Sequence, residues 1–377
     1  MKNPLASLSP LALGAMLAGT SHLTAGHATT QSGTDATAFI QELGLREAPT
    51  ALRDQPGWRK PRTIIVPKDG YDLTWLREAA PGVEFIVARD DAEAEAAAPR
   101  ADAVFAFCSA RLLERGQKIR WMQLMNAGVE RCLANTAIAE RGILVTNMQR
   151  VAGPAMAEHV MAMLLSISRG LPMYLRQQEQ SRWDQPSDED SPAFVLQDKT
   201  MFIAGLGGIG TEVARRAHAF GMRIVATSAS NRPAPEFVSH LGPPGELLAL
   251  AREADVIVNS LPLTAQTTHV FDAKIFSAMK PTAVFINVGR GGTVDTGELV
   301  KALQEKRLRG AALDVTDPEP LPSDHPLWRM PNVVITPHVS ADTDRGRTLR
   351  WQVARENLRR YVAGERMLSV VDVKRGY

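Results

Sequence analysis

The chain has 377 residues, of which 45% are apolar and 22% charged, and its formal net charge is +2 at pH 7. This composition is ordinary for a globular protein, and the length exceeds what one hydrophobic core usually organises, so we expect two domains. The small net charge, without a basic run interleaved with aromatic residues, argues against a nucleic-acid-binding protein and against attachment to an anionic membrane.

The first 28 residues resemble a secretory signal peptide. A lysine precedes a mildly apolar stretch from Leu5 to Ala18, and the small residues Gly26 and Ala28 form a plausible cleavage pattern. The apolar stretch is short and interrupted by serine and proline, so we expect no stable membrane span. Two interpretations stay open, an export signal or a plain extension, and residues 1–28 are left out of the fold prediction.

From Arg62 onward, short apolar runs alternate with helix-prone segments such as Asp72 to Ala79 and Glu130 to Glu140. Short buried strands that alternate with helices are typical of a parallel sheet with helical crossovers. The runs of this first series are TIIVP, VEFIVA, ADAVFAF, WMQLM and GILVTN.

The chain contains two cysteines, Cys108 and Cys132. Two are too few for a disulfide framework, and they lack the C-x-x-C spacing of metal or redox sites. We expect two reduced, mostly buried thiols and no metal site.

A long helix-prone stretch, GPAMAEHVMAMLLSISRGL, and a polar loop from Gln185 to Pro192 separate this series from a second one. The second series contains six strand candidates, the number in a complete doubly wound nucleotide-binding sheet. They are KTMFIAGLG, MRIVATS, ADVIVNSL, TAVFINVG, GAALDVT and NVVITPH, and a charged helix, RTLRWQVARENLRRYVAG, closes the chain.

The first strand of the second series leads into a dinucleotide fingerprint. Gly205, Gly207 and Gly210 fit G-x-G-x-x-G, with a strand before them and a helix and second strand after them, which is the context the motif requires. The first glycine permits the tight turn, the second lets the backbone approach a pyrophosphate, and the third lets helix and strand pack closely. The amides of Gly208 and Ile209 then face the phosphates.

The end of the following strand indicates which dinucleotide binds. Enzymes that use NAD usually carry an acidic residue there for the ribose hydroxyls, whereas this chain has Ser228 followed by Ser230, Asn231 and Arg232. Hydroxyl, amide and guanidinium groups suit a 2′-phosphate, which a carboxylate would repel. We expect NADP, or NAD as the second choice.

Three polar residues follow later strands of the same sheet: Arg290 between two glycines, Glu319 in a proline-rich loop, and His338. The carboxyl ends of parallel strands form the ligand-binding edge, so a cation, a carboxylate and an imidazole are predicted to meet there. An arginine is costly to bury without an acidic partner. Either another part of the chain or a ligand is therefore expected to supply the anion that pairs with Arg290.

With these motifs the chain closely resembles the D-isomer-specific 2-hydroxyacid dehydrogenases, in particular those of the glyoxylate and hydroxypyruvate reductase type. The shared motifs occur in the family's order and span nearly everything from Arg62 to the C-terminus. They are NAGVE (Asn126 to Glu130), AEHVMAMLL, GLGGIG, NSLPLT, NVGRGGTVD, ALDV with PEPLPSDHPLW, and ITPHVSA.

The resemblance implies an α/β protein with two doubly wound domains. A flavodoxin-like substrate domain is expected from residues 36–150 and 341–377, at both ends of the chain, and a Rossmann cofactor domain from residues 151–340. It implies catalytic roles for Arg290, Glu319 and His338, and a homodimer. The substrate-carboxylate loop maps onto Ala127, Gly128 and Val129, and further cofactor contacts onto Leu261, Pro262, Val288 and Asp314.

The chemistry of these residue types agrees with reduction of a 2-oxo acid. His338 is suited to deliver a proton to the carbonyl oxygen, Glu319 to orient the imidazole and favour its protonated form, and Arg290 to bind the substrate carboxylate. A dinucleotide-sensing corepressor of the same fold stays open as an alternative, because it can keep all three residues. The cofactor favours the cytoplasm, while residues 1–28 leave export open.

Overall fold

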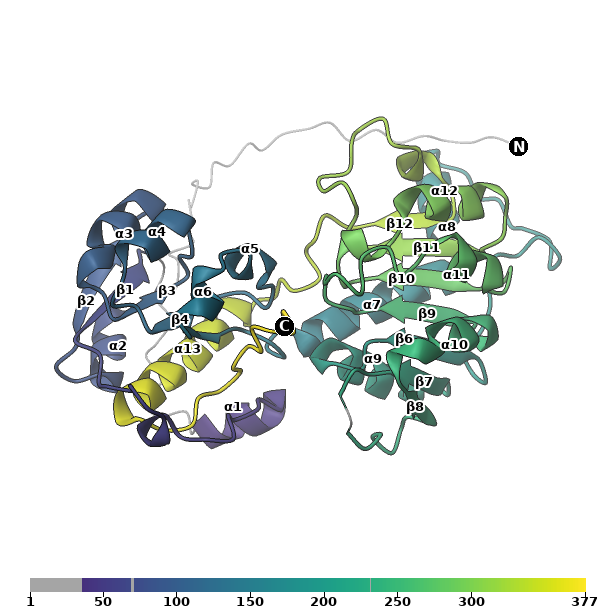
Figure 1. The fold of residues 1–377 in the computed structure, drawn as a ribbon. Helices are drawn as coiled ribbons and strands as arrows, with labels where there is room; N and C mark the ends of the chain where they lie inside the picture. The colour runs from purple at the N-terminus through teal and green to yellow at the C-terminus, as the bar shows by residue number, and fades with distance from the viewer. Residues whose placement is uncertain (1–35, 69–70, 231) are drawn as a thin grey trace, which may run out of the picture. The chain divides into compact units, whose positions relative to one another are not determined.

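The structure, a computed structural model, describes residues 36–68, 71–230 and 232–377. The predicted signal peptide, residues 1–28, lies outside the described residues. The named strands form two sheets, both entirely parallel (Figure 1).

The first sheet has five strands in the order β2-β1-β3-β4-β5, the flavodoxin-like order. Each of the five predicted apolar runs supplies one strand. Strands β3 and β4 are fully buried because helices cover both faces of a doubly wound sheet. The strands are β1 (Thr63–Pro67), β2 (Glu84–Ala88), β3 (Ala103–Phe105), β4 (Trp121–Gln123) and β5 (Leu144–Thr146).

The second sheet has seven strands in the order β12-β11-β10-β9-β6-β7-β8, which contains the Rossmann order with its reversal between β6 and β9. All six predicted strands are present. The additional strand, β8, was missed because HLG is only three residues long and mostly not apolar. The strands are β6 (Thr200–Ala204), β7 (Arg223–Thr227), β8 (His240–Gly242), β9 (Val256–Asn259), β10 (Val284–Asn287), β11 (Gly310–Leu313) and β12 (Val333–Ile335).

Helices connect the strands, and several begin at a side-chain cap. Asp272 accepts a hydrogen bond from the backbone N–H of Lys274, and Asp295 one from that of Glu298, so each satisfies an amide in the first turn of its helix. The helices are α1 (Ala36–Leu43), α2 (Leu73–Ala79), α3 (Asp91–Ala97), α4 (Ala110–Arg115), α5 (Glu130–Leu133), α6 (Ala137–Glu140), α7 (Gly153–Ser168), α8 (Leu171–Glu179), α9 (Gly208–Ala219), α10 (Leu247–Glu253), α11 (Ala273–Ala278), α12 (Thr296–Gln304) and α13 (Gly346–Ala363).

The two ends of the described chain complete the core of the first sheet. Phe39 of α1 and Leu358 of α13 belong to the same buried cluster as Trp121 of β4. The ring of Tyr361, also on α13, stacks on Trp121 with centroids 4.5 Å apart. The predicted fold, two doubly wound α/β units with the first built from both ends of the chain, is confirmed.

The prediction of two reduced thiols is wrong, because Cys108 and Cys132 form a disulfide. Cys108 follows β3 and Cys132 lies in α5, and their Cα atoms are 5.5 Å apart, within bonding range. Strands β3 and β4 are neighbours, so the segments after their carboxyl ends meet. The sequence spacing of 24 residues could not reveal this contact.

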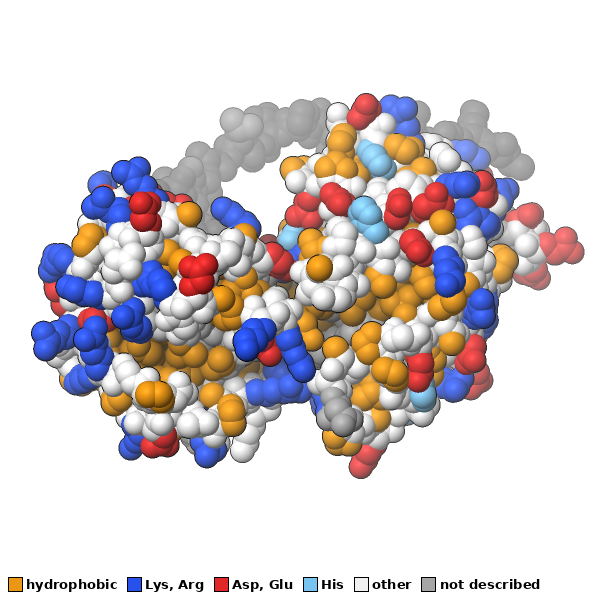
Figure 2. Space-filling view, viewed as in Figure 1, with side chains coloured by type: hydrophobic (Ala, Val, Ile, Leu, Met, Phe, Trp, Pro, Cys, Tyr) orange, Lys and Arg blue, Asp and Glu red, His pale blue; other side chains and the backbone are white. Residues whose placement is uncertain are grey.

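Figure 2 shows one face of the molecule, on which basic, acidic and apolar side chains are all exposed. Several large apolar side chains stand exposed on α8 and the segment after it, including Leu175 at 57% and Trp183 at 97% exposure. Within the described residues, no helix has the length and apolar character needed to cross a membrane.

Candidate active site

The turn between β6 and α9 has the geometry that the glycine fingerprint predicts. Gly205 has φ +91°, a conformation that L side chains rarely adopt. A Cβ on Gly210 would lie 2.4 Å from the carbonyl oxygen of Gly205, so only glycine lets α9 pack this closely. A Cβ on Gly207 would meet no atom within 4 Å, which leaves space for a ligand beside the amides of Gly208 and Ile209.

The end of β7 carries hydroxyl groups and a guanidinium. The hydroxyls of Ser228 and Ser230 are hydrogen-bonded at 2.9 Å, and Arg232 Nη2 donates to Thr211 Oγ1 at 3.4 Å. Arg232 Nε is buried without a hydrogen-bond partner among the described residues, and Asn231 lies outside them. Hydroxyl and guanidinium donors of this kind suit a phosphate.

The carboxyl ends of β9, β10, β11 and β12 are joined side by side. The N–H of Val288 donates to the carbonyl of Asn259, that of Asp314 to Asn287, and that of Thr336 to Leu313. The segments after these strands therefore lie along one edge of the sheet. The segment after β9 is Ser260, Leu261 and Pro262, and the Ser260 hydroxyl donates to the carbonyl of Gly205 at 2.8 Å.

Arg290 follows β10, and its two flanking glycines are required by close backbone packing. A Cβ on Gly289 would lie 2.6 Å from the carbonyl oxygen of Leu261, and one on Gly291 only 1.8 Å from that of Thr316. Any side chain at either position would push the loop away from the sheet edge. The glycines thus fix the backbone from which the Arg290 side chain extends.

Arg290 is paired with a carboxylate of the chain itself, contrary to our prediction that its anion is the substrate alone. Arg290 Nε donates to Glu130 Oε1 at 3.0 Å, and Nη1 donates to the carbonyl of Gly289 at 2.8 Å. Nη2 lies beside Gly128, 2.3 Å from where a Cβ on that residue would stand. The ion pair brings Arg290 against the predicted substrate loop, and both side chains are about one-third exposed.

The loop that carries Gly128 is anchored on both sides. The carbonyl of Ala127 accepts a hydrogen bond from Asn147 Nδ2 at 2.7 Å, and Val129 is buried. The disulfide holds α5, which begins at Glu130, from the other side. Glu130 stood within the NAGVE motif but was not predicted as a site residue, because nothing in its spacing marks it as the partner of an arginine 160 residues away.

Glu319 and His338 meet as predicted from their positions after β11 and β12. Glu319 Oε1 lies 2.6 Å from His338 Nδ1, and both side chains are nearly half exposed. His338 has φ 55°, an uncommon conformation for a residue other than glycine. The contact on Nδ1 leaves Nε2 as the ring nitrogen available to a ligand.

Asp314 is buried beneath the loop that carries His338. The carboxylate accepts hydrogen bonds from the Thr336 hydroxyl at 2.7 Å and from the N–H groups of Val339 and Ser340. Burial opposes ionisation of Asp314, but the hydrogen bonds from residues 336, 339 and 340 outweigh it and hold its pKa below the usual range. Asp314 therefore acts here as the anionic anchor of the His338 loop.

His159 of α7, which the sequence suggests is a structural residue without partners, has partners at this anchor. Its Nε2 lies 2.9 Å from Thr336 Oγ1 and 3.7 Å from Asp314 Oδ1. The imidazole thereby ties α7 to the segment before His338.

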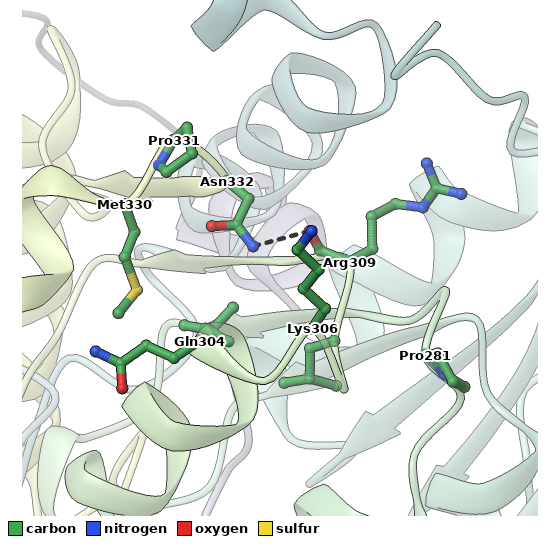
Figure 3. A pocket seen from close by; sticks show the side chains of 9 residues that line it. Pro281, Gln304, Lys306, Arg309, Met330, Pro331 and Asn332 are labelled. Carbon is green, nitrogen blue, oxygen red and sulfur yellow. Dashed lines mark hydrogen bonds between the residues drawn. The ribbon is translucent and has the colours of Figure 1, made fainter. Parts of the chain in front are cut away.

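A cavity of about 530 Å³ lies elsewhere, near the amino ends of β10 and β11 (Figure 3). In Figure 3 the Asn332 amide points toward the backbone of Arg309, to whose carbonyl it donates at 3.1 Å, while the Arg309 guanidinium points away. None of the predicted site residues lines this cavity. Ligands of doubly wound sheets bind at the carboxyl edge, so the candidate site is the Arg290, Glu319 and His338 edge.

The site thus combines hydrogen-bond donors that suit a dinucleotide, the Arg290 guanidinium beside the Gly128 loop, and the Glu319–His338 pair.

Residues 161–340 match the model of the family described as D-isomer specific 2-hydroxyacid dehydrogenase, NAD binding domain. Glyoxylate reductase/hydroxypyruvate reductase of Mus musculus is 37% identical over 257 residues, which is 67% of this chain and 77% of that protein.

Solved structures of family members have a similar fold over most of their length. A D-isomer specific 2-hydroxyacid dehydrogenase family protein from Aeromonas salmonicida is 33% identical with a TM-score of 0.70, covering 83% of this chain and 99% of the other. An NADPH-dependent glyoxylate/hydroxypyruvate reductase from Sinorhizobium meliloti, in complex with NADP and sulfate, is 28% identical with a TM-score of 0.70 over 84% and 100% of the two chains. The chain therefore belongs to the D-isomer specific 2-hydroxyacid dehydrogenases, and it is an NAD(P)-dependent oxidoreductase acting on CH-OH and keto groups.

Proposed function

We propose that this protein reduces small 2-oxo acids of the glyoxylate or hydroxypyruvate type with NADPH. The observation that carries the proposal is the pair of Glu319 and His338, 2.6 Å apart, at the same sheet edge as Arg290 and its substrate loop. A hydride acceptor with a carboxylate next to its carbonyl needs a proton donor and an anion-binding cation, and these residues provide both.

Three features of the described residues fit the phosphates of a bound dinucleotide. The open space at Gly207, the amides of Gly208 and Ile209, and the buried, unpartnered Nε of Arg232 suit a molecule that carries phosphates. Nicotinamide, when bound, supplies the hydride. We assign further cofactor contacts to Leu261, Pro262, Val288 and Asp314 because they follow the strands at this edge.

His338 donates a proton to the carbonyl oxygen as it gains negative charge. Glu319 binds Nδ1, which holds the ring in one orientation with Nε2 toward the substrate. In the reverse direction the same nitrogen accepts the hydroxyl proton. Glu319 is thus a positioning residue for His338.

Arg290 binds the substrate carboxylate with its Nη2 edge. Nε and Nη1 are already occupied by Glu130 and the Gly289 carbonyl, so the guanidinium plane is held in place before substrate arrives. The backbone amides of Ala127, Gly128 and Val129 share the anionic charge. Each such donor contributes on the order of 3 kcal/mol to transition-state stabilisation.

The preference for NADP is supported by the end of β7. Ser228, Ser230 and Arg232 provide donors and no carboxylate at the position where the ribose 2′-oxygen is expected. The Sinorhizobium meliloti relative is described as NADPH-dependent.

Steady-state assays of a 2-oxo acid panel with NADPH and NADH test the proposal. We expect the highest kcat/KM for glyoxylate or hydroxypyruvate, and at least about tenfold preference for NADPH, which corresponds to roughly 1.4 kcal/mol. A tenfold preference for NADH would refute the cofactor assignment. Tight dinucleotide binding without turnover of any 2-oxo acid would favour the corepressor-like alternative.

We also propose that residues 36–150 and 341–377 form the substrate domain and residues 151–340 the cofactor domain. A second copy of the chain is the proposed partner, supported by the exposed apolar side chains Leu175 and Trp183 on α8 and the segment after it. Light scattering of the purified protein measures this assembly.

The cofactor and the disulfide favour different compartments. Free nicotinamide dinucleotides are cytosolic metabolites, which favours the cytoplasm, whereas disulfides persist mainly in oxidising compartments. The Cys108–Cys132 disulfide therefore supports export with the cofactor already bound. Mass spectrometry of the mature amino terminus decides between them, because cleavage of a signal peptide would make Thr29 the first residue.

A further inference from the structure

Three arginines from distant segments converge beside the fingerprint turn. Arg46 lies between α1 and the bridge of Glu47 with Leu368, Arg150 directly precedes the turn into α7, and Arg232 follows β7. Arg150 contacts Gly208 and Arg232 contacts Thr211, both in the first turn of α9, and Arg150 Nη1 lies beside Gly44, two residues before Arg46. Burial lowers the pKa of Arg150, and the charges of Arg46 and Arg232 lower it further. Burial and the charge of Arg46 likewise lower the pKa of Arg232.

The side chain of Arg150 packs against Gly208, the first residue of α9. A Cβ on Gly208 would stand 2.7 Å from Arg150 Cγ and 3.2 Å from its Cα, so glycine at position 208 makes room for this arginine. At its other end, Arg150 Nη1 lies 3.3 Å from where a Cβ on Gly44 would be. The side chain therefore reaches from the amino end of α9 to the end of α1.

The backbone of Arg150 is held in an uncommon conformation. Its φ is 75°, in the left-handed region that residues with a Cβ rarely occupy. Such conformations persist where the surrounding structure imposes them, and they concentrate at ligand-binding sites. The conformation is consistent with a side chain placed for a ligand.

Arg232 contributes an unsatisfied donor to the same place. Its Nη2 donates to Thr211 in the first turn of α9, and its Nε is buried without a partner among the described residues. A buried guanidinium donor without an acceptor is unfavourable, and an anion that accepts from it removes that cost.

Among the described residues, the carboxylate that acts on Arg150 already has other cationic partners. Glu212 is the carboxylate whose charge acts on Arg150. Its oxygens are already paired, with Arg216 Nη1 at 2.7 Å and Arg215 Nη2 at 3.4 Å. The cluster of Arg46, Arg150 and Arg232 therefore favours a ligand with more than one negative charge.

We propose that this arginine cluster binds the phosphates of NADP, with Arg46 and Arg232 on the 2′-phosphate and Arg150 on the pyrophosphate at the amino end of α9. The inference rests on the proposed use of NADP and names the residues, two of them far from the fingerprint in sequence, that would enforce it. Because Arg46 belongs to the N-terminal segment that pairs with residue 368, phosphate binding also ties that segment to the cofactor site.

Equilibrium binding of adenosine nucleotides tests the cluster without any turnover. The probes are 2′,5′-ADP and 5′-AMP, which differ only in the 2′-phosphate, and each competes against a fluorescent dinucleotide on the full-length protein. The wild type is expected to bind 2′,5′-ADP at least about tenfold more tightly than 5′-AMP.

In Arg46→Gln and in Arg232→Gln, the preference for 2′,5′-ADP over 5′-AMP is expected to fall to about threefold or less. The affinity of each variant for 5′-AMP should stay within about twofold of the wild-type affinity. Arg150→Gln is expected to weaken both nucleotides by about tenfold and keep their ratio. Arg252→Gln, a change of an exposed arginine on α10, is the matched control and is expected to alter neither. Circular dichroism and thermal unfolding establish that each variant is folded.

The proposal is wrong if folded Arg46→Gln keeps the wild-type ratio of the two affinities. Failure of the proposed reductase function has a different signature: selective 2′,5′-ADP binding that depends on Arg46, together with no oxidation of NADPH by any 2-oxo acid.

Discussion

Glu130 and Arg290, 160 residues apart in the chain, form an ion pair with Nε 3.0 Å from Oε1. The pair joins the helix after the substrate loop to the loop after β10, and it sets the orientation of the guanidinium before any substrate is bound. Arg290 also donates to the Gly289 carbonyl, so two of its three nitrogens are committed to the protein.

Replacing Arg290 by lysine tests this geometry. Lysine keeps the charge but has no planar fork, so it cannot hold Glu130, the Gly289 carbonyl and a substrate carboxylate together. We expect kcat/KM for reduction to fall about a hundredfold or more, measured from initial rates on folded protein. Arg252→Lys on exposed α10 is the control. Near-wild-type turnover of Arg290→Lys would remove Arg290 from substrate binding.

Gly128→Ala introduces a methyl group where the structure has no room. Its Cβ would lie 2.3 Å from Arg290 Nη2 and 2.9 Å from Glu130 Oε2, so the guanidinium must move away from the substrate loop. We expect a loss of about a hundredfold in kcat/KM, with little change in dinucleotide affinity. Gly245→Ala, where a Cβ meets nothing within 4 Å, should behave as wild type.

Glu319→Gln keeps the shape of the side chain but removes its charge from His338. The imidazole then loses the anionic partner that holds it in place, so we expect kcat for reduction to fall about tenfold or more while dinucleotide affinity is kept. A second histidine–glutamate pair supplies the control, because His240 Nε2 lies 2.6 Å from Glu246 Oε2 outside the predicted site. Glu246→Gln should leave kcat unchanged, and a wild-type kcat in folded Glu319→Gln would contradict the role of Glu319.

Asp314→Asn tests the anchor beneath the His338 loop through stability at acid pH. The folded state holds the pKa of Asp314 below its ordinary value of 3.8. The ionised carboxylate therefore stabilises the fold above pH 3.8, and this contribution is lost as the pH falls below that value. At neutral pH we expect Asp314→Asn to be less stable by about 1–3 kcal/mol.

Urea unfolding at a series of pH values measures this difference, which should narrow as the pH is lowered toward 3. Asp344→Asn, at an exposed position, is the control and should follow the wild type throughout. If the free energies of unfolding of Asp314→Asn and wild type differed by the same amount at every pH, the ionised Asp314 carboxylate would not be the anchor.

The disulfide predicts both a thiol count and a stability change. Protein denatured without reductant should show no free thiols, because Cys108 and Cys132 are both in the bond. The bond closes a loop over 24 residues of sequence, so the Cys108→Ala, Cys132→Ala double variant should lose about 3 kcal/mol in urea unfolding. Two titratable thiols in freshly purified protein would contradict the bond.

The sequence by itself determined the two parallel sheets, the fingerprint turn, and the presence of Arg290, Glu319 and His338 at strand ends. These features are local: apolar runs predict buried strands, glycines permit a tight turn, and parallel strands share a carboxyl edge. The strand β8 was missed because three weakly apolar residues give too small a signal.

Only the tertiary structure decided which side chains meet. The Glu130–Arg290 ion pair, the Cys108–Cys132 disulfide and the arginine cluster join segments that are remote in sequence. No periodicity or spacing encodes such contacts, because they depend on how strands β3, β4 and β10 and the segment before α7 are placed by the packed core. The types of catalytic group are therefore a property of the sequence, whereas their partners are a property of the fold.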